Sequence, residues 1–228
     1  MNKFVKFLVP MTLVAVASGC SSLNMDSMMG AAGGGSSQQS NVSADDVVAN
    51  QEKIVDDYVL AAGAVNAAQT KIASALNLKE QVAELEEAAA ALGRGSVQDA
   101  DSLEKISETS ARADAAIQSE LEAGESLSYE SKKELASSLI PYALSVKQVK
   151  EMSDEFKPFL ESSKASISGA PMTEKASLTS KLSSGMYVAK NAPGLMTDLV
   201  STGSQLLSYA KSQNIDVPAE ATDALGSL

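Results

Sequence analysis

The amino-acid sequence predicts an all-α protein, an elongated antiparallel bundle of about four to five helices that is partly like a coiled coil. Three observations predict this fold class. From Ser43 onward apolar residues recur at steps of three and four, alanine is abundant, and no segment alternates as a strand would. Narrow apolar stripes on long helices favour a bundle over a compact globular domain.

Composition divides the chain into three parts. Residues 1–19 hold a short apolar run after Lys3 and Lys6, residues 20–42 form a tether rich in Gly, Ser and Met, and residues 43–228 form the helical domain. A basic start, a short apolar stretch and small residues are typical of a secretory signal peptide, which is too short to span a bilayer permanently. The helical domain is long enough to bury a core of its own.

The first predicted helix runs from Ser43 to about Leu92. Ser43 is a suitable N-cap, and Gly93 is a suitable stop. Unbroken, this helix has about fifty residues and a length of about 75 Å. We expect either Gly63 or the neighbourhood of Asn77 to bend or divide it.

The second and third helices each carry one apolar stripe. The second ends at Gly124, and the third begins near Ser128. Proline removes a backbone donor and crowds the preceding turn, so Pro141 should kink the third helix and Pro158 should bend it again. Residues 166–171 are predicted to be a loop. The two stripes are Leu103, Ile106, Ser110, Ala113, Ile117 and Leu121, and Leu135, Leu139, Tyr142, Val146, Val149, Phe156 and Leu160.

The fourth and fifth helices are expected on either side of a break. The fourth starts at Thr173 and runs to about Lys190, and the run Asn191-Ala192-Pro193-Gly194 separates it from the fifth. The fifth carries Leu195, Leu199, Leu206 and Tyr209. Beyond Asn214 we expect the tail to add one short helical turn.

Composition excludes several classes of site. The chain has no His and no Trp, and Cys20 is its only cysteine. Nucleophile and base pairs that need His, and zinc, copper or haem sites that rely on His or Cys, are therefore excluded. Enzymes based on carboxylates, Lys or Tyr remain open, but no pair of such residues stands out. We expect no enzyme and no dissociable cofactor.

Charge argues against nucleic acid as a partner. Without residues 1–19 the chain keeps 16 basic and 29 acidic residues, a net charge of about −13. Such an acidic body repels phosphate backbones and anionic headgroups.

Ala17, Ser18 and Gly19, directly before Cys20, resemble the lipobox of bacterial lipoproteins. The resemblance covers about the first twenty residues. It implies cleavage between Gly19 and Cys20, and diacylglycerol and N-acyl lipid such as palmitate on Cys20. Ser21 in place of Asp then favours the outer membrane, facing the periplasm, in a Gram-negative cell. The alternative is an ordinary signal peptide cut after Ala17 or Gly19, with Cys20 merely nearby.

An apolar groove is one candidate site. Leu139, Tyr142 and Phe156 could line a groove for a lipid or a partner helix. Core packing is the commoner role of aromatic residues at helical spacing.

Two further groups have the residue types of metal sites. The trio Met25, Met28 and Met29 could hold copper(I), although loose methionines in a tether or a short membrane contact are commoner. The carboxylates of Asp56–Asp57 and Glu84–Glu87 could bind calcium, but their spacing does not match a calcium loop. A solvated acidic face explains them better, so we expect no metal.

The favoured hypothesis is a non-enzymatic envelope lipoprotein, held on the membrane by its lipid. Its helical body would act as a scaffold or as an interaction module for another envelope protein. The alternative is a carrier of a hydrophobic ligand or lipid, held between helices kinked near Pro141.

Overall fold

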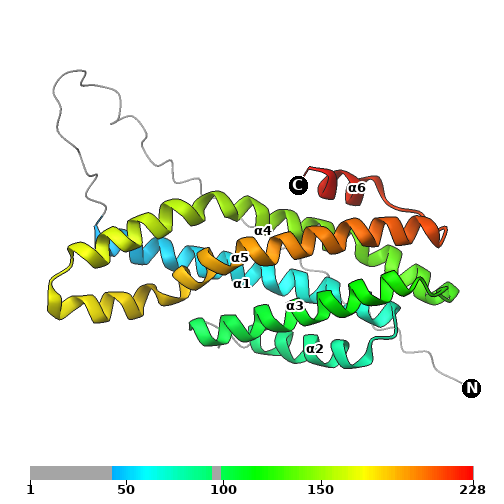
Figure 1. Cartoon of the computed structure of the whole chain (residues 1–228), viewed down its shortest axis with the longest axis horizontal. Coiled ribbons are helices and arrows are strands. Elements are labelled where there is room, and N and C mark those ends of the chain that lie inside the picture. The colour runs from blue at the N-terminus through cyan, green and yellow to red at the C-terminus, as the bar shows by residue number, and fades with distance from the viewer. Residues whose placement is uncertain (1–42, 94–98, 228) are drawn as a thin grey trace, which may run out of the picture. The chain divides into compact units, whose positions relative to one another are not determined.

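The computed structural model describes residues 43–93 and 99–227, which form six helices (Figure 1). The described residues contain no strand, so the all-α prediction is confirmed. The helices are α1 (Ala44–Ala75), α2 (Lys79–Gly93), α3 (Ala100–Ala123), α4 (Tyr129–Gly169), α5 (Met172–Ser212) and α6 (Ala219–Gly226).

Four of these helices form a bundle. α1 packs on α4, α4 on α5, α5 on α3, and α3 on α1. The other two lie outside it: among the described residues α2 contacts only α1 and α3, and α6 contacts only α4 and α5 (Figure 1). Short connections make consecutive helices antiparallel. For example, α4 meets α5 both at Tyr142 with Leu199 and at Phe159 with Gly185.

The bundle interior holds two large apolar clusters. Both combine residues of α1, α3, α4 and α5, as the stripes on these helices predict. The first includes Val65, Ile72, Ile117, Leu135, Leu139, Tyr142, Val146, Leu199 and Leu206. The second includes Ile54, Tyr58, Leu103, Ile106, Phe156, Phe159, Leu182 and Val188.

Three helix boundaries agree with the sequence. The Ser43 hydroxyl accepts a hydrogen bond from the Asp46 amide at 3.1 Å, and the Ser128 hydroxyl caps α4 in the same way. Gly124 ends α3 with a φ of 69°, which favours glycine. Of the two positions considered for dividing the first helix, Asn77 divides it, with a φ of 62°, whereas Gly63 stays inside α1.

Two predicted interruptions are wrong. The predicted loop over 166–171 is helical as far as Gly169. The predicted break at 191–194 lies inside α5, which is continuous for 41 residues. Proline removes only one backbone donor from the helix. The helix continues through Pro193 because residues on both sides of it are buried, namely Ala189, Ala192 and Leu199.

The C-terminal segment forms a longer helix than the one predicted turn. α6 seats Leu225 against α5 at Gly203, where a side-chain Cβ would lie 2.8 Å from Leu225 Cδ2. Leu225 belongs to the first core cluster together with Ala221 and Ala224. α6 is therefore part of the core, and it is the sixth helix of the described residues.

Candidate functional site

The sequence-predicted lipidation and cleavage residues, Cys20 and Gly19, lie outside the described residues. So do the predicted signal peptide over 1–19, the tether over 20–42 and its three methionines. Among the described residues, no helix combines the length and the hydrophobicity that a bilayer-spanning segment needs.

The three residues of the predicted apolar groove lie in the core. Leu139 and Tyr142 belong to the first apolar cluster, whereas Phe156 belongs to the second. Each is at most 3% exposed. The structure therefore does not bring these side chains to one open groove.

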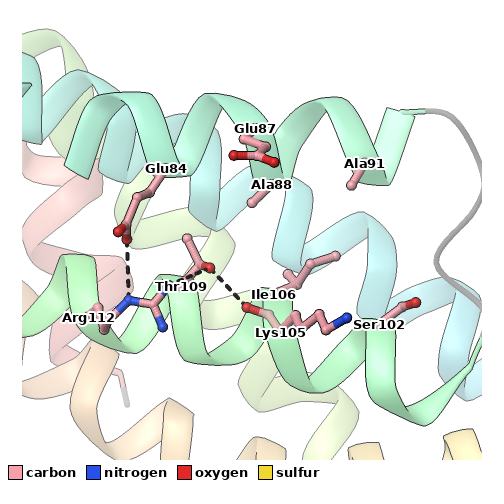
Figure 2. A pocket seen from close by; sticks show the side chains of 9 residues that line it. All are labelled: Glu84, Glu87, Ala88, Ala91, Ser102, Lys105, Ile106, Thr109 and Arg112. Carbon is pink, nitrogen blue, oxygen red and sulfur yellow. Dashed lines mark hydrogen bonds and ion pairs between the residues drawn. The ribbon is translucent and has the colours of Figure 1, made fainter. Parts of the chain in front are cut away.

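A crevice lies between α2 and α3 on the described surface. Its volume is about 390 Å³, and it is open to solvent. Figure 2 shows α2 supplying one wall and α3 the other. The lining residues are Glu84, Glu87, Ala88, Ala91, Ser102, Lys105, Ile106, Thr109 and Arg112.

One ion pair closes an end of this crevice. Arg112 Nε lies 3.3 Å from Glu84 Oε2, and another guanidinium nitrogen of Arg112 donates to the Thr109 hydroxyl at 3.1 Å (Figure 2). Both partners of the ion pair are more than a third exposed, so its contribution to stability is small. The crevice combines a small apolar floor with a mixed-charge rim, without an enclosed volume for a ligand.

The acidic groups singled out in the sequence do not gather into a metal site. Glu84 is paired with Arg112, and Asp57 lies 2.9 Å from Lys53. Within residues 43–93 and 99–227 no three His, Cys, Asp or Glu residues are placed to hold a metal ion.

A polar cluster that sequence reasoning missed lies inside the bundle, where α3 meets α1 and α4. Gln69 Nε2 donates to Asp114 Oδ1 at 3.0 Å, and the Ser110 hydroxyl donates to Gln69 Oε1 at 2.9 Å. The Tyr142 hydroxyl donates to the Leu199 carbonyl at 2.9 Å. Gln69, Ser110, Asp114 and Tyr142 are at most 3% exposed.

Burial changes the acidity of two members of this cluster. Burial raises the pKa of Asp114 to about 6, against the lowering effect of the hydrogen bond from Gln69 and of the nearby Thr202 hydroxyl. Burial and the charge of Asp114 raise the pKa of Tyr142 well above its ordinary value. Tyr142 is therefore a hydroxyl donor at any physiological pH, and Asp114 is the group that titrates.

A weak sequence signal for this cluster existed. Asp114 follows Ala113 on the buried side of the stripe that contains Ser110 and Ile117, so an acidic residue there interrupts an apolar face. The burial of Asp114 depends on its contacts with other helices, which the pattern of one helix does not reveal.

The α1–α4 surface shows a shallow hollow of about 290 Å³. Its floor is built from small residues of α1, including Ala64 and Ala67, and its α4 side includes Pro141 and Leu144. Leu144 is 52% exposed, and Leu60 on α1 is 67% exposed. Pro141 therefore faces solvent at this hollow and does not line an internal cavity.

No family model, no curated protein and no solved structure matches this chain.

Proposed function

We propose that this protein is a lipid-anchored lipoprotein of the bacterial envelope, non-enzymatic, whose helical body acts as a scaffold or interaction module. One observation carries the proposal: small residues lead directly into the single cysteine, Cys20, at the end of a short apolar leader with a basic start. The lipid on Cys20 would hold the protein at the membrane surface, because two or more acyl chains anchor stably. Ser21 favours the outer membrane of a Gram-negative cell.

The helical body supports a scaffold better than a carrier of a hydrophobic ligand. A carrier requires an enclosed apolar cavity, and Leu139, Tyr142 and Phe156 are instead packed into two separate core clusters. A scaffold requires a firm body with surface available to a partner. The long, well-packed helices α4 and α5 and the exposed Leu60 and Leu144 meet that requirement. The partner would be another envelope protein, brought to high local concentration by the shared membrane.

The lipid anchor is tested by metabolic labelling. Labelled palmitate should enter the wild-type chain and should not enter a Cys20→Ala variant, which should also leave the membrane fraction. A Ser21→Asp variant is the matched control, because it keeps the cysteine and should change only which membrane holds the protein. The proposal fails if the wild-type chain takes up no palmitate, or if Cys20→Ala fractionates with the membrane as the wild type does.

The scaffold role is tested separately by crosslinking in intact cells. We expect the wild type to capture one envelope protein. A control variant that carries a substitution at a buried residue and still folds should capture the same protein. Substitution of Leu60 and Leu144 by Ser should reduce that capture. A purely monomeric product from wild-type cells would contradict the scaffold and favour ligand carriage.

A further inference from the structure

The carboxyl group of Asp114 lies at the point where four helices meet. It is carried by α3, contacts Gln69 of α1 and Tyr142 of α4, and lies near Thr202 of α5. Asp114 is only 2% exposed. A carboxyl group in this position is removed from water in the folded protein and returned to water when α3 separates from the bundle.

The hydrogen bonds at this point are too few for an ionised carboxylate. Gln69 donates to Asp114 Oδ1 at 3.0 Å. Thr202 lies close enough to lower the pKa of the carboxyl, but Asp114 Oδ2 is buried with no hydrogen-bond partner among the described residues. The single proton of the Tyr142 hydroxyl goes to the Leu199 carbonyl at 2.9 Å, because Asp114 Oδ1 is farther away at 3.5 Å. A neutral Asp114 fits this arrangement better than an anion does.

The charges around Asp114 also disfavour the anion. α5 brings Asp198, a second negative group, and α1 and α4 bring the uncharged Gln69 and Tyr142. α2 brings Glu84, which pairs with Arg112. Arg112 is two residues before Asp114 and therefore points to nearly the opposite side of α3. None of these described contacts supplies the cation that a buried carboxylate needs.

We propose that Asp114 is an internal proton-binding site that controls how firmly α3 is seated on α1, α4 and α5. The protonated carboxyl stabilises the seated arrangement, and ionisation weakens it. This inference does not depend on the lipid anchor or on the scaffold role.

The direction of the pH effect follows from burial. Burial raises the pKa of Asp114 in the folded protein from 3.8 to about 6. The folded state therefore binds this proton more tightly than the unfolded chain does. The resulting stabilisation is fully present below about pH 3.8 and is lost as the pH rises through about 6. Two pKa units correspond to about a hundredfold change in the folding equilibrium constant.

The test compares the full-length protein, in detergent, with its Asp114→Asn variant. Asparagine has nearly the same shape and cannot ionise. Urea unfolding near pH 4 and near pH 7 should show a loss of about a hundredfold in the wild-type folding constant that Asp114→Asn lacks. Glu108→Gln is the matched control, because Glu108 is an exposed carboxylate on the same helix. It should keep the wild-type dependence on pH.

Two further measurements locate the effect. Nuclear magnetic resonance titration of the Asp114 carboxyl carbon should give a midpoint near 6. Amide hydrogen exchange, corrected for the intrinsic effect of pH, should show protection lost first in α3 as the pH rises.

Three results would overturn the proposal. One is a wild-type pH profile retained by Asp114→Asn, and another is a carboxyl midpoint at or below about 4. The third is loss of protection spread evenly over all helices. The carboxyl titration decides the question if Asp114→Asn fails to fold, because it uses the wild-type protein.

Discussion

The α4–α5 pair and the α2–α3 pair are both antiparallel helix hairpins, yet they are held to the rest of the molecule in different ways. α4 and α5 bury long apolar stripes in two core clusters, whereas α2 buries only Leu85 and Ala88. α3 mixes its apolar stripe with Ser110 and Asp114. Stability in a helical protein comes mainly from the buried apolar face. The α2–α3 side should therefore open more readily than the α4–α5 side.

Charge separates the same two regions. Residues 79–125 carry 12 acidic and 4 basic residues, whereas residues 129–212 carry 8 acidic and 10 basic residues. Like charges within one hairpin repel each other, and the effect is screened by salt. The acidic excess of the chain is therefore concentrated in the region with the fewer apolar contacts. Added salt should therefore stabilise the packing of α2 and α3 more than the packing of α4 and α5.

The largest expected effect is in the α4–α5 core. Phe159 is 1% exposed and belongs to the second cluster, so Phe159→Ala should lower the free energy of unfolding by about 3–5 kcal/mol. Urea unfolding measures the change. Tyr129→Ala is the control, because Tyr129 is 79% exposed and its loss should change stability by less than about 0.5 kcal/mol. A cost below about 1 kcal/mol for Phe159→Ala would mean that this core carries less stability than its burial indicates.

The next effect should be local to α2. Leu85 is fully buried, and Leu85→Ala should cost about 2–4 kcal/mol of local stability. Because α2 contacts only α1 and α3 among the described residues, amide hydrogen exchange should accelerate in α2 while α4 and α5 remain protected. Glu86→Ala, a change at an exposed position of the same helix, should leave exchange unchanged. Equal acceleration in α5 would contradict the division into two regions.

The smallest effect compares two glycines of α5. A Cβ at Gly185 would lie 2.8 Å from Phe159 Cζ, so Gly185→Ala should cost about 1–3 kcal/mol. At Gly194 no atom lies within 4 Å of such a Cβ, and Gly194→Ala should stabilise the helix by about 0.5–1 kcal/mol. Thermal unfolding measures both. If both substitutions changed the stability in the same direction, close packing at Gly185 would not be the reason that alanine is unfavourable there.

Sequence periodicity predicted the fold class and the stripes of α3 and α4, because those stripes depend on spacing within one helix. The predicted residues Leu103, Ile106 and Ile117 are all buried on α3. The errors at residues 166–171 and 191–194 came from treating Pro and Gly as breaks. Tertiary burial on either side of Pro193 outweighs the local preference.

The site residues were harder to predict than the fold. Tyr142 was singled out as part of an apolar groove, but its distinctive contact is made by the hydroxyl, which donates to the Leu199 carbonyl 57 positions along the chain. Gln69 and Asp114 are 45 positions apart and belong to different helices. Their meeting depends on how α1 and α3 pack, and helical periodicity within one segment carries no information about that register.

Because Gly203 has no side chain, it leaves a notch in the surface of α5. This notch makes the last residues of this chain a poor place for fusions and deletions. Leu225 fills the notch against α5, and the ring of Tyr142 lies 3.4 Å from where a Gly203 Cβ would be. Removing the last dozen residues would bare that ring edge next to the Asp114 cluster. Such a truncation would expose one side of Tyr142 to water and so change the surroundings in which the Asp114 carboxyl titrates.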